Sequence, residues 1–307
     1  LAMACVMLIA IMTTLSLKEP ISQAKNLIHN TKDSLRLLLV FILSILTFIF
    51  IYRLMGSLLP EVKSVGLSFL FGCIQFMASA LAMVISGYFL IDLNVAPKGI
   101  VMQSWVSPIT DFFYRYGKKA GLLLALIGLY RISDIVAGNI SNIFYQDIGF
   151  DKIQIGDAVK VWGVVASIGG GFIGGWVAQK IGIIRAMLLG AALACLTNLL
   201  FIVLFNAPNQ YMLYMTVLTD NLAAGLASAV FIAFLSALTS IQFTATQYAL
   251  FSSLMTLLPK LLGGYSGAIV DATGYPVFFT ITFIIGIPVL YLVYIVGKKI
   301  PLEINKP

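Results

Sequence analysis

The chain has 307 residues, of which 60% are hydrophobic and only 10% are charged, and its formal net charge is +7. A soluble domain carries about 25% charged residues. This small number of charged residues cannot cover a water-exposed surface of this size. The composition therefore excludes an ordinary soluble domain and predicts that lipid is the main solvent.

Apolar runs of helix length recur along the chain, and a transmembrane helix needs roughly 20 consecutive apolar residues. One partial and eight full runs lie at 1–16, 35–56, 64–92, 120–144, 158–179, 184–206, 210–239, 245–270 and 276–297. Membrane β-strands would instead alternate over segments of roughly 10 residues. We therefore predict an all-α, polytopic integral membrane protein. Leu1 stands inside an apolar run, so we expect further N-terminal sequence before it.

Basic residues are concentrated in alternate connectors, which predicts the orientation because cytoplasmic loops are enriched in Lys and Arg. If the first run exits on the cytoplasmic side, that side has 13 of the 19 basic residues: Lys18, Lys25, Lys32, Arg36, Lys98, Arg115, Lys118, Lys119, Lys180, Arg185, Lys298, Lys299 and Lys306. The opposite connectors contain only Arg53, Lys63 and Lys152. This bias predicts a cytoplasmic C-terminus, and it explains the positive charge without any nucleic acid partner.

The connector 98–119 combines basic residues with five aromatic ones, Trp105, Phe112, Phe113, Tyr114 and Tyr116. Aromatic side chains are enriched at the level of lipid headgroups. We predict a short amphipathic helix on the inner membrane surface here; the alternative is a simple polar linker.

Five charged residues lie within the apolar runs, where charge is costly and usually faces a bundle interior or a water-filled cavity. They are Arg131, Asp134, Lys160, Asp220 and Lys260. Arg131 and Asp134 are three residues apart, so they share a helix face and can pair. This pair either contacts a substrate or only holds helices together.

Asp220 is the candidate for a carboxylate that binds and releases protons. Lys160 either lines a site or extends toward the outer face of the membrane. Lys260 follows Pro259 in a run where the helix is expected to bend. Together the five charged residues sum to +1, which would suit an anionic solute.

Residues typical of metal or catalytic centres are sparse. Cys5, Cys73 and Cys195 share no metal or disulfide spacing, and His29 is solitary in a polar connector. We predict no metal and no cofactor. A membrane-embedded transferase would need a cluster of His, Asp or Glu near one membrane face, so the chain is not predicted to be an enzyme. A channel is the other alternative, but Gly- and Pro-interrupted helices with buried charges favour alternating access.

Two kinds of motif resemble a known transporter family. GGWVAQKIGIIR (174–185) resembles the loop motif of the major facilitator superfamily, although Gln179 replaces its acidic residue. The stretches 129–138, 147–163 and 220–254 resemble the AmpG-type muropeptide permeases and the related acetyl-CoA transporters of that superfamily. The segment TATQYAL (244–250) is the most specific element. The resemblance covers most of 105–297.

The resemblance implies a division of the chain. It assigns 1–16 to the last, partial helix of an N-terminal half and 17–34 to a cytoplasmic connector. It makes 35–92 two accessory helices, 93–119 a cytoplasmic amphipathic connector, 120–297 the six-helix C-terminal half and 298–307 a cytoplasmic tail. Roughly five preceding helices would then be absent from this sequence.

The family further implies import of anhydro-muropeptides, fragments from cell-wall turnover, across the bacterial inner membrane with protons. The expected partners are an anionic small molecule, protons and membrane lipid, and we expect a monomer at full length. The residues matching family motifs are Arg131, Asp134, Asp220, Asn221, Gln247 and Tyr248; Lys160 and Lys260 complete the candidate set. Arg131 would meet a substrate carboxylate, and Gln247 and Tyr248 would donate hydrogen bonds at an inner gate, or only cap and pack helices. The alternatives are transport of another anionic solute, such as a peptide or acyl-CoA, and a non-transporting sensor.

Overall fold

The computed structural model describes residues 2–16, 31–60, 62 and 64–300, and all elements in these ranges are helices. Predictions made for Leu1, Lys18, Lys25, His29, Lys63 and Lys306 concern residues outside them. Seven helical stretches in the described ranges are long and apolar enough to cross a membrane: α2 (Thr31–Leu58), α3 (Val65–Asp92), Lys98–Asp147, Lys152–Ile181, α10 (Ile183–Asn206), α11 (Gln210–Leu238) and α14 (Tyr275–Lys299). The prediction of an all-α, multi-pass membrane protein is confirmed.

Two predicted spans are interrupted helices. The run 120–144 divides into α6 (Ala120–Leu129) and α7 (Ile132–Asp147). The run 245–270 divides into α12 (Thr244–Gly263) and α13 (Ser266–Thr273), with Pro259 inside α12. Proline has no N–H for the helical ladder, and α12 ends at Gly263, four residues after Pro259. Because of this break, 245–270 is not one continuous spanning helix.

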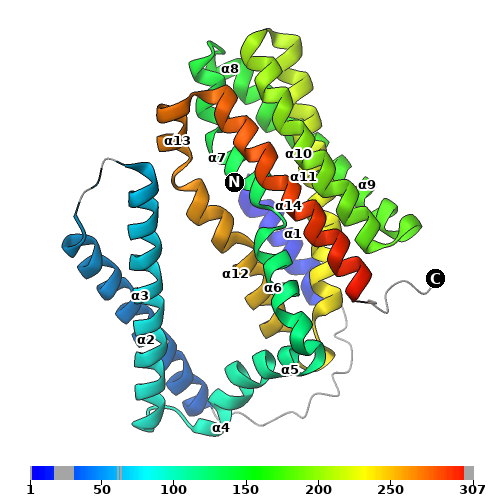
Figure 1. Cartoon of the computed structure of the whole chain (residues 1–307). Coiled ribbons are helices and arrows are strands. Elements are labelled where there is room, and N and C mark those ends of the chain that lie inside the picture. The colour runs from blue at the N-terminus through cyan, green and yellow to red at the C-terminus, as the bar shows by residue number, and fades with distance from the viewer. Residues whose placement is uncertain (1, 17–30, 61, 63, 301–307) are drawn as a thin grey trace.

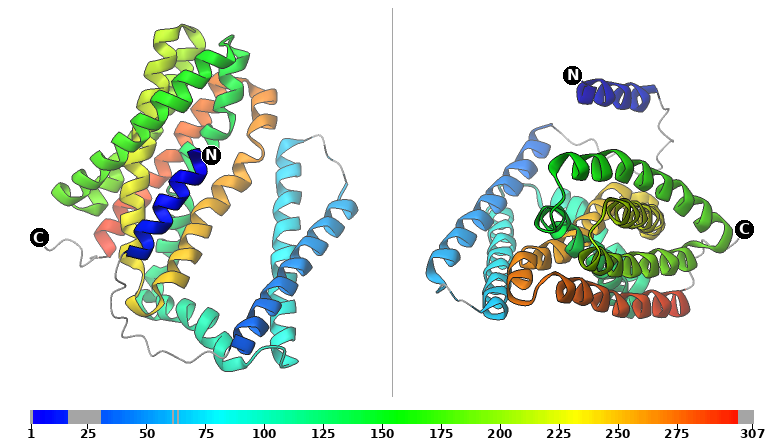
Figure 2. Two further views of the ribbon diagram at one scale, coloured as in Figure 1. Left: turned by 180° about the vertical axis from the view of Figure 1, so that it is seen from behind. Right: turned by 90° about the horizontal axis from the view of Figure 1, so that it is seen from above.

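The helices from α6 onward form a bundle in which α11 occupies the centre (Figure 2, right). Around it lie α7, α10, α12 and α9 (Gly163–Ile181), the last preceded by α8 (Lys152–Ile155) and a π-helical segment, η3 (Gly156–Trp162). Stacked aromatic rings fill the core; Phe201 and Phe279, for example, have centroids 4.6 Å apart. Helix α1 (Ala2–Ser16) lies beside the bundle (Figure 2).

The backbones of α9 and α11 approach one another closely because glycines meet at their crossing. A Cβ atom added to Gly170 would lie 2.1 Å from the Leu222 carbonyl oxygen. Gly174 faces Leu226, and Gly225 faces Ser167, at similarly short distances. Small residues allow such close packing between membrane helices. These three glycines therefore allow the close approach of the two helices.

Other glycines of the same run do not share this role. A Cβ on Gly169, Gly171 or Gly175 would have no neighbour within 4 Å. The helical period turns these three residues away from α11.

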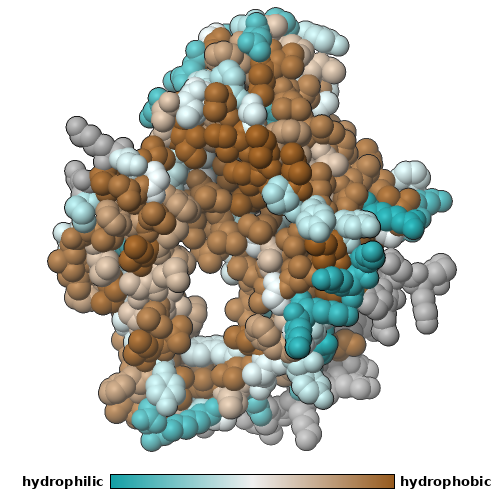
Figure 3. Space-filling model, viewed as in Figure 1, coloured by the Kyte–Doolittle hydropathy of each residue, from teal (hydrophilic) through white to brown (hydrophobic). Residues whose placement is uncertain are grey.

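Helices α2 and α3 form a hairpin that stands to one side of the bundle (Figure 1). Phe48 and Phe76 pack edge to face between the two helices, with centroids 5.6 Å apart. Near α13, the Tyr265 hydroxyl donates to the Ser68 carbonyl at 3.0 Å. Below this contact the space-filling view shows an opening between the hairpin and the bundle (Figure 3). The same view shows mostly apolar side chains along the flanks, as lipid contact requires.

A helical connector crosses the base of the molecule and joins the hairpin to the bundle (Figure 1). It consists of α4 (Lys98–Val101), the π-helical η1 (Met102–Val106), α5 (Ser107–Tyr116) and the 3-10 turn η2 (Gly117–Lys119). Its aromatic residues do not form one exposed set, contrary to expectation. Phe112 is buried against Phe251, whereas Tyr114 is 91% exposed. Trp105 packs near Phe41 of the hairpin, so the connector joins two helical groups.

Gln247 of α12 attaches this connector to the bundle. Its Nε2 donates to Asp111 Oδ2 and to the Pro108 carbonyl, both at 2.8 Å. Its Oε1 accepts from Arg115 at 3.0 Å and from the Ser240 backbone N–H at 2.8 Å. The side chain is buried, and all of its hydrogen-bonding groups are engaged. This geometry matches helix packing, the structural alternative considered for Gln247.

The first prediction concerns the α9–α11 crossing. We expect Gly170→Ala to lower the free energy of unfolding by about 1–3 kcal/mol, the usual cost of overpacking a well-packed core, because the new methyl group meets backbone atoms of Leu222. Thermal unfolding in detergent measures this. Gly171→Ala is the matched control, since its methyl group meets open space. Equal melting temperatures for the two variants would contradict the close approach.

The second prediction concerns Gln247. We expect Gln247→Ala to destabilise the protein by about 2–3 kcal/mol, because the buried Gln247 side chain makes four hydrogen bonds, two of them to charged residues, that are lost. Gln242→Ala is the control, since Gln242 is exposed on the preceding 3-10 turn. Melting temperatures and transport are compared. Unchanged stability with lost transport would indicate a gating role instead of a structural one.

Candidate functional site

The interruption between α6 and α7 places a charged pair inside the bundle. Arg131 is the N-cap residue of α7, and Asp134 lies in the first helical turn, where the helix dipole favours negative charge. The Arg131 Nε donates to Asp134 Oδ2 at 2.8 Å, and the pair forms a salt bridge. The two side chains are only 18% and 8% exposed. The pairing predicted from their spacing is therefore present and largely buried.

Arg131 also contacts the central helix, because its Nη1 donates to the Ser228 hydroxyl of α11. Tyr130, the other residue at the break, stacks on Phe231 with centroids 4.4 Å apart. Its hydroxyl donates to the Met187 carbonyl of α10 at 2.9 Å. The break is thus held from both sides by α10 and α11.

A second buried network lies next to this pair. The Asn198 amide of α10 donates to the Ser133 hydroxyl at 2.8 Å, and Ser133 donates to the Thr282 carbonyl of α14 at 2.8 Å. Three helices are joined in this way. The carbonyl oxygen of Asn198 is buried and has no hydrogen-bond partner among the described residues, which leaves an acceptor for a water molecule.

Asp220 lies on α11, eight residues before Ser228, which corresponds to roughly 12 Å along the helix axis. Thr197 of α10 donates its hydroxyl hydrogen to Asp220 Oδ1 at 2.9 Å. Thr197 adjoins Asn198, which donates to Ser133 beside Asp134 on α7, so α10 links Asp220 to the charged pair. α7, α10 and α11 therefore bring three of the predicted site residues together, and we call Arg131, Asp134, Asp220, Thr197 and Ser228 the polar site.

The other candidates lie apart from this polar site. Asn221 bonds its own helix, donating to the Val217 carbonyl at 2.8 Å, and packs against Gly163 of α9. Tyr248 is half-buried against the hydrophobic core. Lys160 and Lys260 are exposed and form no ion pair within the described part of the chain. The five charged residues of the apolar runs therefore do not lie together. The sequence analysis had added their charges as if they lined one cavity.

Four polar residues of these networks were not predicted as site residues from the sequence. Ser133, Thr197, Asn198 and Ser228 are uncharged and stand within otherwise apolar runs. Asn198 was the most detectable, since an amide is unusual in the apolar centre of a span. Their contribution depends on which helices face each other, which a linear pattern does not reveal.

The polar site combines a guanidinium with two carboxylates. A guanidinium presents several donors in a fixed fork to a carboxylate, and Asp220 accepts one hydrogen bond from the Thr197 hydroxyl. Within residues 2–16, 31–60, 62 and 64–300 no group of three His, Cys, Asp or Glu side chains is arranged to bind a metal ion.

Comparison with known proteins places the chain among transporters. It is 28% identical to the AmpG 4 protein of Rickettsia conorii over 74% of this chain and 57% of that protein. It is 33% identical to the AmpG 1 protein of Rickettsia bellii over 58% of this chain and 44% of that protein. It is 31% identical to the anhydromuropeptide permease of Escherichia coli K12 over 66% of this chain and 41% of that protein. No family model matches the chain.

The chain spans about half the length of these relatives. The names of these relatives, AmpG and anhydromuropeptide permease, agree with one another. They are also consistent with the polytopic helical bundle described above. Over the matched part of its length, the chain is similar to AmpG-type permeases.

Proposed function

We propose that the protein is a secondary transporter that imports anhydro-muropeptides by proton symport and alternating access. The observation that carries this proposal is the polar site at the α6–α7 break, in a chain related to an anhydromuropeptide permease. Broken helices with charged or polar groups near the middle of the membrane are typical of substrate and ion sites in transporters.

Arg131 is proposed to contact an acidic group of the substrate. It lies near the middle of the span formed by α6 and α7, which follows the connector. In this structure Asp134 is bound to the Arg131 guanidinium. A substrate carboxylate would compete with Asp134 for the guanidinium, and this competition would link substrate binding to the position of α7 relative to α11.

Asp220 is proposed to couple transport to protons. Protonation removes its charge and weakens the hydrogen bond from the Thr197 hydroxyl, which also donates to the Ala194 carbonyl at 3.1 Å. Because Asp220 and Arg131 carry opposite charges in the same polar site, protonation would also change how strongly Arg131 attracts an anion. A change of this kind biases an alternating-access equilibrium only to the extent that it favours one state over the other.

The charge distribution supports an orientation with the connector end in the cytoplasm. Within the described residues, the end of the molecule with α5 collects the basic residues Lys32, Arg36, Lys98, Arg115, Lys118, Lys119, Lys180, Arg185, Lys298 and Lys299. The acidic residues there, Asp33, Asp92 and Asp111, are paired with Arg36, Lys98 and Arg115. The positive-inside rule then favours a cytoplasmic C-terminus. We propose a multi-pass inner-membrane monomer.

Uptake of labelled anhydro-muropeptide into vesicles containing the full-length protein tests the proposed function directly. We expect uptake that is driven by an inward proton gradient and competed by unlabelled substrate. A neutral or acyl-CoA solute serves as the comparison. Preferential uptake of acyl-CoA would favour the alternative solute class and reject the muropeptide proposal.

The third prediction is that Asp220→Asn abolishes gradient-driven uptake, because an amide does not exchange a proton at this position. Counterflow of substrate without a gradient should be retained. Asp271→Asn is the matched control, since this aspartate is exposed on α13. Undiminished gradient-driven uptake in Asp220→Asn would reject this residue as the coupling group.

The fourth prediction is that Arg131→Gln weakens binding of an acidic substrate by about 10- to 100-fold, the equivalent of roughly 1.5–3 kcal/mol for a charged hydrogen bond. A substrate analogue with a neutral amide should lose much less. The double variant Arg131→Gln/Asp134→Asn removes the unpaired buried carboxylate and separates folding from binding. Equal losses for both substrates in both variants would indicate a structural pair only.

A further inference from the structure

The hairpin α2–α3 contacts the bundle at the break between α12 and α13, where Tyr265 lies. The Tyr265 hydroxyl donates to the Ser68 carbonyl of α3 at 3.0 Å. Its ring packs edge to face on Phe69, with centroids 5.3 Å apart. Gly72, one turn beyond Ser68, leaves room for the hydroxyl, because a Cβ atom there would lie 2.2 Å from it. We call these three residues of α3 the Tyr265 seat.

The same break also contacts α7. The Ser266 hydroxyl, in the first turn of α13, donates to the Val136 carbonyl at 3.3 Å. Gly263, the last residue of α12, lies against the side chain of Asn139, since a Cβ atom on this glycine would be 1.9 Å from Asn139 Nδ2. Residues at both ends of the break therefore contact α7, within one turn of each other.

These contacts lie close to the polar site along α7. Val136 is two residues beyond Asp134 and five beyond Arg131, which corresponds to roughly 8 Å along the helix axis. Because α7 begins after the α6–α7 break, the helix α6 does not run on into it. The position of the beginning of α7 therefore depends on contacts with neighbouring helices, and the α12–α13 break supplies two of them.

Much of the hairpin surface lies away from the bundle (Figure 1). Phe50 of α2 and Tyr88 of α3 are 66% and 72% exposed, and further exposed apolar side chains recur along both helices. In a membrane these surfaces contact lipid. A change in the position of the hairpin in the bilayer would therefore act on the bundle through the Tyr265 seat and the connector.

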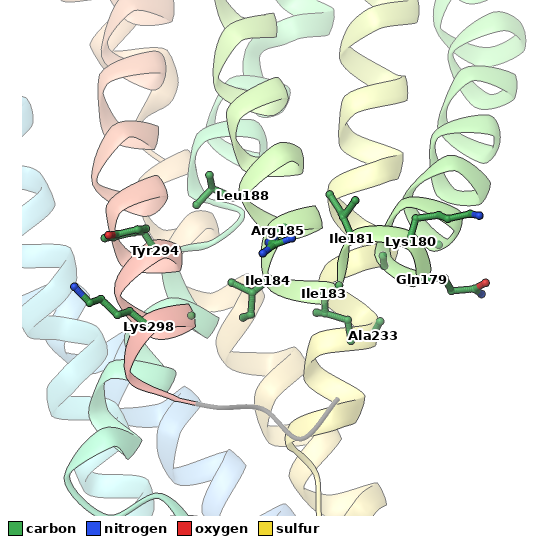
Figure 4. A pocket seen from close by; sticks show the side chains of 14 residues that line it. Gln179, Lys180, Ile181, Ile183, Ile184, Arg185, Leu188, Ala233, Tyr294 and Lys298 are labelled. Carbon is green, nitrogen blue, oxygen red and sulfur yellow. The ribbon is translucent and has the colours of Figure 1, made fainter. Parts of the chain in front are cut away.

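The groove at the connector end of the bundle is separate from this connection. It is lined by residues of α9, α10, α11 and α14, and by none from the hairpin or the polar site. Its side chains Lys180 and Lys298 point in opposite directions (Figure 4). This groove therefore links neither the hairpin nor a shared ligand position to the polar site, whereas the α12–α13 break contacts both the hairpin and α7.

We propose that Tyr265 is a positioning residue through which the hairpin α2–α3 regulates the polar site. Held in its seat on α3, Tyr265 fixes the α12–α13 break, and the break fixes the beginning of α7 with Arg131 and Asp134. Displacement of the hairpin would loosen the beginning of α7 without any direct contact with the charged pair. The proposal depends neither on the transported solute nor on proton coupling.

Hydrogen exchange of the purified protein in lipid nanodiscs, resolved by peptides, tests the proposal, because amide exchange reports the free energy of local opening. Tyr265→Phe keeps the ring and removes the hydrogen bond, whereas Gly72→Ala displaces the hydroxyl from its seat. We expect each variant to raise exchange rates in residues 262–270 and 131–139 by about fivefold, the equivalent of roughly 1 kcal/mol for one hydrogen bond.

Two matched variants control for effects confined to the hairpin. Gly66→Ala makes the same change on α3, but its methyl group meets open space. Tyr88→Phe removes the hydroxyl of an exposed tyrosine on the same helix. Both controls should leave the exchange of residues 131–139 unchanged.

A double-variant comparison tests the path from the break to α7. Ser266→Ala removes the hydroxyl that donates to the Val136 carbonyl. In this background, the effect of Gly72→Ala on residues 131–139 should fall by at least half, because interacting positions do not contribute additively.

Three outcomes would overturn the proposal. Faster exchange in residues 262–270 with unchanged exchange in 131–139 would show that the hairpin is only attached to the bundle. An equal rise in either control variant would show a general effect on the hairpin. An undiminished effect in the Ser266→Ala background would show that the break does not carry the coupling. If Gly72→Ala fails to fold, Tyr265→Phe, which keeps the ring, decides the first two outcomes and replaces Gly72→Ala in the third.

Discussion

The close contact between α9 and α11 positions the rest of the bundle, since α11 is its central helix and supplies Asp220 and Ser228. Gly170, Gly174 and Gly225 allow this contact because a side chain at any of them would collide with backbone atoms. Without a hydrophobic force between helices inside lipid, close packing and hydrogen bonds hold them together. These three glycines therefore set the approach of α9 to α11, and Gly190 of α10 lies against Ala227 of α11 in the same way.

Low polarity around the bundle explains why its buried charges are paired. A buried charge with no partner is costly, and removing one partner of a buried pair strongly destabilises a protein. Arg131 has two partners on two helices, and Asp220 accepts from Thr197. Because each partner comes from a different helix, a change in charge at Asp220 or Arg131 acts on helix positions. This is the physical basis on which proton binding and helix movement are proposed to be linked.

The connector end of the molecule combines fixed polar contacts with unpaired positive charge. Gln247 engages both Asp111 and Arg115 and joins α5 to α12. Lys119 donates to the Lys299 carbonyl at 2.7 Å and joins the ends of α6 and α14. This end of the bundle is therefore held by internal hydrogen bonds.

Composition and run length alone determined the membrane-embedded, all-helical class, because both report on the solvent that each residue must meet. Spacing alone determined that Arg131 and Asp134 pair, since residues three apart share a helix face. Only the tertiary structure decided that Asp220 joins them, that Lys160 and Lys260 do not, and that Gly170 packs while Gly171 does not. These facts depend on which helix faces meet, and helix rotation and crossing are set by contacts between residues far apart in the sequence.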